Sequence, residues 1–96
     1  MKRSEVLDTA RQYVSSDRNA QYGEPEENFR QVAQMWDVVL RPAIERGSFK
    51  PHEIALAMAC VKLARIGSSP EKTDSWIDLA GYAACGAECL HDEGAE

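Results

Sequence analysis

The residues best suited to chemistry are carboxylates at the starts of two segments with helical character. Glu27 stands in the first turn of one segment, next to Glu24 and Glu26, and Asp74 and Asp78 open the other, four residues apart and on one helical face. Magnesium prefers hard oxygen ligands and keeps several waters, so carboxylates on adjacent helices can hold it against a polyphosphate. Such an ion would neutralise phosphate charge and orient an attacking water. Glu27, Asp74 and Asp78 are therefore the candidate Mg²⁺ ligands and catalytic residues.

Two cations lie in an apolar run, ALAMACVKLARI, that precedes the second acidic pair. Lys62 and Arg65 are three residues apart and therefore share one helical face. If the two helices form an antiparallel hairpin, a rise of about 1.5 Å per residue places Lys62 level with Asp78 and Arg65 level with Asp74. The cations could bind phosphate oxygens beside a metal. The alternative is that both pairs are only ion pairs between helices, and the sequence leaves both interpretations open.

A polar stretch between the first two helical segments, SDRNAQYGEP, contains one aromatic residue, Tyr22. Tyr22 could stack on a base, while Asn19 or Asn28 hydrogen-bonds to the edge of that base. The alternative is a capped loop whose tyrosine covers the edge of the core. The candidate substrate-binding residues are Asp17, Arg18, Tyr22, Asn28, Lys62, Arg65 and Tyr82.

Length and charge limit the classes of protein to consider. Ninety-six residues predict a single domain over 1–96, with a core over about 4–90 and a frayed tail over 91–96. The net charge of −5 argues against direct binding to nucleic acid, which normally requires a basic face. The sequence contains no apolar run near membrane-spanning length, and its start, MKRSEVLDTARQ, has no signal-peptide core. We expect a cytoplasmic protein without membrane contact.

The hydrophobic periodicity predicts an all-α protein with four helices and no strand. Ser4 is the expected N-cap of the first helix, which runs to about Ser15. The second helix begins at Pro25 and ends near residue 42, with AIER adding a further turn. The third spans about 51–66 with Gly67 just beyond its end, and the fourth spans about 74–90. Short connections between the four helices predict a four-helix bundle.

The second half of the chain contains three cysteines and several small residues. Cys60, Cys85 and Cys89 lie in helical apolar runs and are predicted to be reduced core thiols, although Cys85, Cys89 and His91 could instead bind a metal. Gly81 and Gly86 should each cost about 1 kcal/mol relative to alanine inside a helix. A close backbone approach would offset that cost. The approaching group could be another helix, within the bundle or across a dimer, or it could be a ligand.

Three motifs together carry a resemblance to a known family. DRNAQYGEPEENF, ALAMACVKLARI and DSWIDLAGYAACGAE, covering about 17–88, look like a family of small, uncharacterised proteins of phages and prophages. That family is similar in turn to the MazG-like all-α nucleoside triphosphate pyrophosphohydrolases. Members of that superfamily are helical bundles that usually oligomerise. They bind magnesium through helix carboxylates and cleave nucleoside triphosphates to monophosphate and pyrophosphate.

The acidic motifs match that superfamily in part. Its signature is an EExxE helix followed by an ExxD helix, whereas Asp74 and Asp78 are spaced by four, and Arg30 follows Glu27 where an acid is expected. The resemblance implies an oligomeric, MazG-like phage protein that binds a nucleotide and magnesium and hydrolyses the nucleotide. We favour a dimer, because so small a bundle gains core by pairing. The alternative is a non-catalytic helical module that binds another protein or sequesters a nucleotide.

Overall fold

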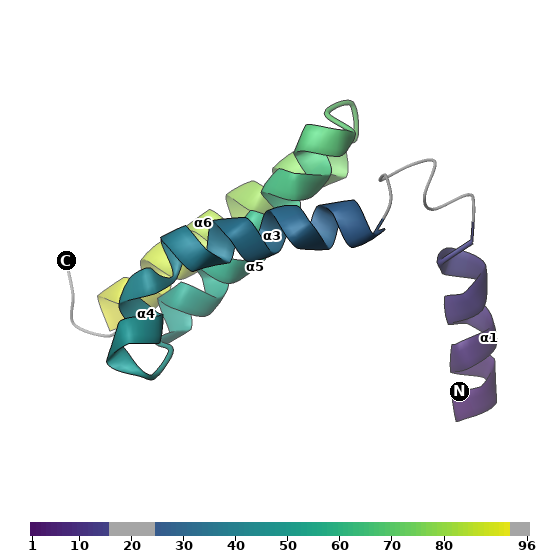
Figure 1. The fold of residues 1–96 in the computed structure, drawn as a ribbon, viewed down its shortest axis with the longest axis horizontal. Helices are drawn as coiled ribbons and strands as arrows, with labels where there is room; N and C mark the ends of the chain where they lie inside the picture. Colours follow the sequence, from purple (N-terminus) through teal and green to yellow (C-terminus); the bar gives the residue numbers. More distant parts are fainter. Residues whose placement is uncertain (16–24, 93–96) are drawn as a thin grey trace.

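A computed structural model describes residues 1–15 and 25–92, and all regular structure in these residues is helical. The helices are α1 (Arg3–Tyr13), α3 (Pro25–Val39), α4 (Arg41–Arg46), α5 (Pro51–Ser68) and α6 (Thr73–Asp92) (Figure 1). The prediction of an all-α protein is confirmed for this part of the chain. The expected further turn at AIER is also confirmed, as the separate helix α4.

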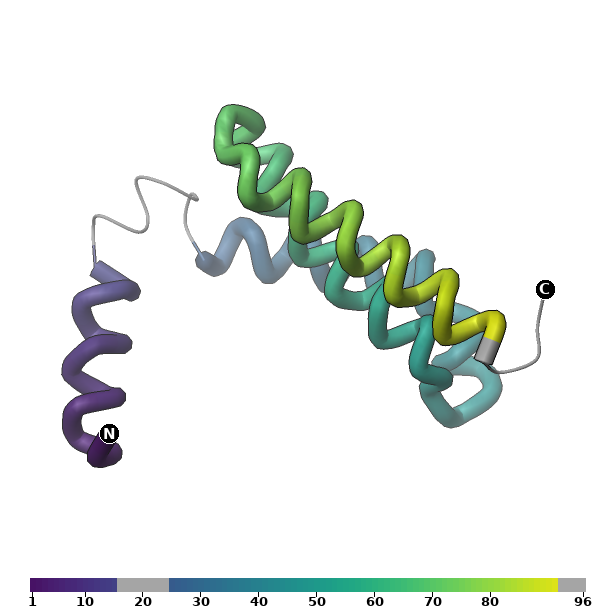
Figure 2. Tube along the Cα trace, turned by 180° about the vertical axis from the view of Figure 1, so that it is seen from behind, coloured from purple at the N-terminus to yellow at the C-terminus, as the bar shows by residue number. Residues whose placement is uncertain are grey.

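An antiparallel hairpin of α5 and α6 is the largest packed element, and the two helices lie side by side along their length (Figure 2). The turn over 69–72 is held by hydrogen bonds from the N–H of Lys72 to the carbonyl of Ser69 and from the N–H of Ser75 to the carbonyl of Lys72, at 3.1 and 3.2 Å. Gly86 packs tightly against α5, because a Cβ there would be 3.0 Å from the Cβ of Ala55. The predicted close approach is therefore confirmed at Gly86.

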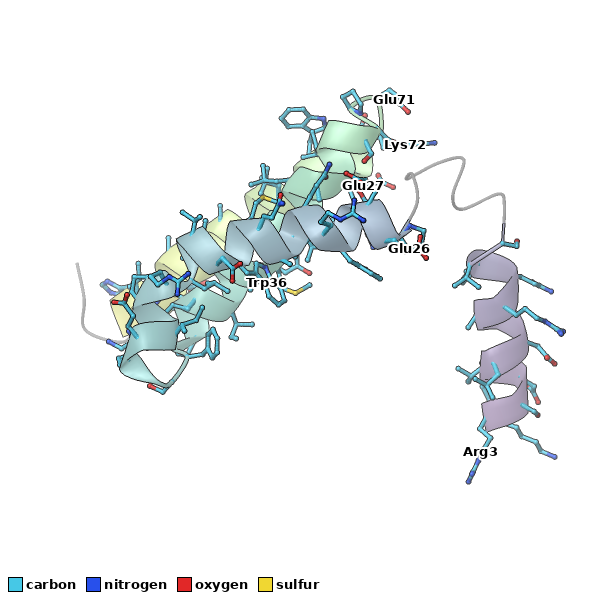
Figure 3. The ribbon with its side chains drawn as sticks, in the orientation of Figure 1. Arg3, Glu26, Glu27, Trp36, Glu71 and Lys72 are labelled. Carbon is cyan, nitrogen blue, oxygen red and sulfur yellow. The ribbon has the colours of Figure 1, made fainter. Side chains whose placement is uncertain are left out.

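Helix α3 packs against α5 on a different side from α6 (Figure 1). Val32 is buried at this contact, and the indole Nε1 of Trp36 donates a hydrogen bond of 2.9 Å to the carbonyl of Ala57 (Figure 3). Leu40 separates α3 from α4. Helix α4 ends at Arg46, and the C-cap residue Gly47 after it has a left-handed φ of 83°. A glycine adopts this φ without the strain that a Cβ would introduce.

A buried carboxylate fixes the corner between α4 and α5. The backbone N–H of Lys50 donates to Glu53 Oε1 at 2.8 Å, and the guanidinium of Arg46 donates to the same oxygen. These two donors favour the ionised carboxylate, so they lower the pKa of Glu53, and the bond from Lys50 has the larger effect. The first turn of α5 is therefore held by a charged hydrogen-bond acceptor.

Helix α1 differs most from its prediction. It begins at Arg3 with Lys2 as the N-cap residue, so Ser4 lies inside the helix and its predicted capping role is wrong. None of its residues is buried, and apolar side chains such as Leu7 (67% exposed) face solvent. Figures 1 and 2 show α1 apart from the other helices. The predicted four-helix bundle is therefore not formed within one chain.

The packed helices leave much of their apolar surface exposed. Phe29 and Ile77 are 71% and 62% exposed, although their spacing along amphipathic helices predicts that they are buried. The run over 55–66 is also only partly buried, because Leu56 and Leu63 remain 42% and 47% exposed. The buried apolar residues are Val32, Leu40, Ala43, Ala57, Cys60, Ala64 and Ile66. Most of these residues are small, so the core shared by helices α3 to α6 is modest.

Several local predictions need correction. Gly67 lies inside α5, which continues to Ser68, so it does not mark the helix end. Gly81 has no neighbour that a Cβ would touch, so close packing accounts for Gly86 alone. Cys60 is buried, and desolvation raises the pKa of its thiol, whereas Cys85 is exposed and therefore is not a core residue.

Candidate functional site

A lysine–aspartate pair joins α5 to α6. Lys62 Nζ lies 2.8 Å from Asp78 Oδ2, and the two side chains are 12% and 49% exposed. The helical rise predicted that Lys62 and Asp78 lie at the same level of an antiparallel hairpin, and this prediction is confirmed. The ammonium is mostly withdrawn from water, while the carboxylate remains half in solvent. The structure thus shows directly this predicted contact between two candidate site residues.

Arg65 and Asp74 lie closer to the turn that joins α5 and α6. Arg65 is half-buried and Asp74 is exposed at the start of α6. The facing of these two residues stays a prediction from their level in the hairpin. Together with the pair of Lys62 and Asp78, they place opposite charges at one end of the hairpin, which we call the turn end.

The beginning of α3 reaches the same turn end. The Ser68 hydroxyl donates a hydrogen bond of 3.0 Å to Asn28 Oδ1, which ties the last residue of α5 to the first turn of α3. Asn28 is thereby placed in the same region as Arg65, as expected if both contribute to one site. Ser68 was missed from the sequence because it lies in the polar run GSSPEKT, which indicates only a turn.

Glu27 lies on the outer side of this region and is already engaged. Its Oε2 atom is 2.7 Å from the Arg30 guanidinium, and both side chains are exposed. Figure 3 shows Glu27 at the same end of the molecule as Glu71 and Lys72 of the turn. The arginine in the position where the superfamily signature has an acid therefore pairs with Glu27 within its own helix.

The carboxylates do not form a preassembled metal site. Over residues 1–15 and 25–92, no three Asp, Glu, His or Cys side chains converge as ligands would. Glu27 is paired with Arg30 and Asp78 with Lys62, so two of the three proposed ligands are occupied by cations. The donor set present here does not fit a three-carboxylate magnesium site. In the same described range, Cys85, Cys89 and His91 do not form a metal-ligating cluster either.

The remaining predicted substrate-binding residues fall into two groups. Tyr82 is one turn beyond Asp78 and lines an apolar groove with Leu56 and Ala59, farther from the turn end. Asp17, Arg18 and Tyr22 lie outside the described residues. The predicted base-binding loop therefore stays a prediction.

The turn end combines helix N-termini, cations and carboxylates. Two helices, α3 and α6, begin there, and the N-terminus of a helix carries a partial positive charge. Lys62 and Arg65 add two cations on one face of α5, and Ser68 and Asn28 add neutral polar groups. A guanidinium and an ammonium together can bind the oxygens of one phosphate chain.

Comparison with known proteins gives a family and phage relatives. The model of the Domain of unknown function (DUF6378) matches residues 5–90. The Gene 55 protein of Mycobacterium phage D29 is 32% identical over 91 residues, which are 95% of this chain and 56% of that protein. The Gene 55 protein of Mycobacterium phage L5 is 33% identical over 79 residues, 81% of this chain and 47% of that protein. The chain thus spans about half the length of these curated relatives.

No solved structure matches the chain significantly. Among the helices that the structure describes, none has the length and apolar character needed to cross a bilayer. The match over 5–90 includes α1 together with α3, α4, α5 and nearly all of α6. Most of helix α1 therefore belongs to the region that the family model matches, although α1 buries none of its residues here.

Proposed function

Because the chain belongs to the DUF6378 family and its relatives are phage proteins, we propose that it is a phage protein that binds a nucleoside phosphate at the turn end. In this proposal Lys62 and Arg65 bind phosphate oxygens. Asn28 and Ser68 hydrogen-bond to the nucleoside or its phosphates. Asp17, Arg18 and Tyr22 would complete the nucleoside pocket.

The observation that supports this proposal is the environment of Lys62. Its side chain is only 12% exposed, yet its partner Asp78 is half in solvent. An ammonium withdrawn from water loses solvation, and a second anion beside it would help to replace that solvation. Asp78 can turn toward solvent when a phosphate oxygen takes its place, so the pair can open without leaving either charge unsolvated.

Hydrolysis is the finer part of the proposal. The resemblance to MazG-like enzymes favours cleavage of a nucleoside triphosphate to monophosphate and pyrophosphate, with Asp74 and Asp78 as the residues closest to the second acidic motif. The engagement of Glu27 by Arg30 favours the alternative, in which the protein sequesters a nucleotide without cleaving it. An assay for pyrophosphate release from the bound nucleotide distinguishes hydrolysis from sequestration without cleavage.

Thermal melting against a panel of nucleoside and deoxynucleoside triphosphates, with and without magnesium, tests the binding step. A ligand at a hundred times its dissociation constant adds about 2.7 kcal/mol to the free energy of unfolding. For a domain of about this size, each kcal/mol raises Tm by about 4–8 °C. We expect one nucleotide to raise Tm by about 10 °C or more.

The matched variants are Lys62→Gln and Arg41→Gln. Arg41 is exposed on α4, at the other end of α3 from the turn end. Each variant is compared with its own melting temperature without nucleotide, so a change in intrinsic stability does not affect the result. The nucleotide shift should be lost in Lys62→Gln and retained in Arg41→Gln. No shift with any nucleotide, or equal shifts in both variants, would contradict the proposed site.

A further inference from the structure

Two of the carboxylates considered as magnesium ligands each contact a basic side chain. Asp78 Oδ2 lies 2.8 Å from Lys62 Nζ, and Glu27 Oε2 lies 2.7 Å from Arg30 Nη1. The two contacts are independent of each other, because the first joins α5 to α6 and the second lies within α3. A divalent cation can bind either carboxylate only if the basic group beside it makes way.

The two ion pairs differ in what happens to the basic group when the pair opens. Arg30 can turn into water, since its side chain is 64% exposed. Lys62 has little access to water, because its side chain is only 12% exposed. When Asp78 leaves, the ammonium of Lys62 therefore needs another anion as its partner.

A magnesium ion on Asp78 would do the opposite of what Lys62 requires. It would take the counter-ion from the ammonium and place two further positive charges beside it. Like charges a few Å apart repel each other more strongly in a partly buried place than in water. A phosphate oxygen instead gives the ammonium a new charged hydrogen-bond acceptor, while Asp78 turns into the solvent that it already half contacts. The geometry of this pair therefore favours a phosphate over a metal.

We propose that the turn end binds the phosphates of a nucleotide by charge exchange, without a divalent cation, as a phosphate oxygen replaces Asp78 beside Lys62. Charge exchange rests on the proposed function, since it requires that a nucleotide binds at the turn end. It makes Asp78 a competitor of the ligand and not a ligand of a metal. An anion then binds only if it interacts with Lys62 more strongly than the carboxylate does. A phosphate group does so, because it carries more negative charge than a carboxylate and more acceptor oxygens.

Magnesium in solution then acts on the nucleotide and not on the protein. It binds the phosphate oxygens and neutralises the charge that would otherwise interact with Lys62. The nucleotide free of magnesium should therefore bind at least as tightly as its magnesium complex.

Calorimetric titration of the full chain with the panel of nucleoside and deoxynucleoside triphosphates tests this, in EDTA and in excess magnesium. We expect the nucleotide that binds to have a Kd in EDTA no higher than its Kd in magnesium. A nucleotide that binds only in magnesium would overturn charge exchange and leave the proposed function intact. If no nucleotide binds in either buffer, both charge exchange and the proposed function are wrong.

Asp78→Asn distinguishes a competitor from a metal ligand, with Glu45→Gln as the control. An ion pair with one exposed partner is equivalent to up to about fivefold in an equilibrium constant, so Asp78→Asn should lower Kd in EDTA about three- to fivefold. Glu45→Gln removes the same charge from an exposed position on α4. Helix α3, about 22 Å long, separates α4 from the turn end (Figure 1), so Glu45→Gln should change Kd less than about 1.5-fold at physiological salt.

Glu27→Gln is a second test, which remains valid if Asp78→Asn loses stability. Both side chains of its ion pair are exposed, so the variant should keep the helicity of the wild type by circular dichroism. It should bind the nucleotide as tightly as the wild type or more tightly, because it releases Arg30. A rise in Kd of more than about threefold relative to Glu45→Gln, in either folded variant, would overturn charge exchange. Equal Kd values for Asp78→Asn and Glu45→Gln would overturn it as well.

Discussion

Removing either member of the pair of Lys62 and Asp78 should have unequal effects on stability. Asp78→Asn leaves an ammonium that is only 12% exposed without its counter-ion. The cost of such an unpaired group is about 1–3 kcal/mol, below the 3–5 kcal/mol of a fully buried charge, because Lys62 keeps some access to water. We expect Asp78→Asn to lower the free energy of unfolding by about 2 kcal/mol.

Lys62→Met should cost much less. The substitution retains the apolar stem of the side chain, and the remaining carboxylate is 49% exposed and can be hydrated. Contacts of exposed ion pairs are worth about 0–1 kcal/mol, so the expected loss lies in that range. The difference between the two variants, at least about 1 kcal/mol, comes from the unequal burial of the two side chains.

Denaturant titration at pH 7 measures both variants, and the double variant closes a mutant cycle. Asp37→Asn on α3 is the control, because Asp37 is also an exposed aspartate within a helix. In the double variant neither charge remains, so its stability should recover to that of Lys62→Met. Equal losses from the two single substitutions, or a loss from Asp78→Asn no larger than that from Asp37→Asn, would refute the reasoning.

Three further predictions concern other parts of the fold. The pKa of Glu53 is lowered in the folded state. Its carboxylate therefore contributes stability above the unfolded pKa near 4.5, and this contribution is lost as pH falls through the lower folded pKa. Melting temperatures measured over a series of acidic pH values should depend less on pH in Glu53→Gln than in the wild type. Gly81→Ala should raise the free energy of unfolding by about 0.5–1 kcal/mol, because the new Cβ would contact no neighbour. Gly86→Ala should raise it less, or lower it, because the new Cβ would lie 3.0 Å from Ala55 Cβ. Denaturant titration measures both changes. A disulfide reagent should modify exposed Cys85 rapidly and buried Cys60 only after unfolding, as timed thiol release under native conditions will show.

The sequence allowed the helical class, most helix ranges and one ion pair to be predicted. Lys62 and Asp78 could be matched because a short turn fixes the relative level of two helices whose rise per residue is constant. The end of α5 was misplaced because Gly67 is a common helix-ending residue, but here the chain remains helical to Ser68. Local propensity does not determine which of two adjacent residues ends a helix.

Burial was less predictable than helicity. Phe29 has the spacing of a core residue on α3 but is 71% exposed. An apolar pattern predicts that a side chain is covered, but it does not predict which element covers it. The carboxylate of Glu27 was predicted as a metal ligand, and its ion pair with Arg30 depends on a rotamer that sequence does not specify. The role of Asn28 in a site stays a prediction, and its hydrogen-bond partner Ser68 could not be foreseen because it lies 40 residues away.

The four-residue turn between α5 and α6 has a consequence for how the chain folds. The contacts next to this turn join residues near in sequence, so little chain entropy is lost before they form. The hairpin is therefore expected to form first, within microseconds to milliseconds, with α3 docking onto it afterwards. In stopped-flow experiments, substitutions at buried Ser69 or Ser75 should then slow refolding, whereas truncation of Val32 should mainly accelerate unfolding.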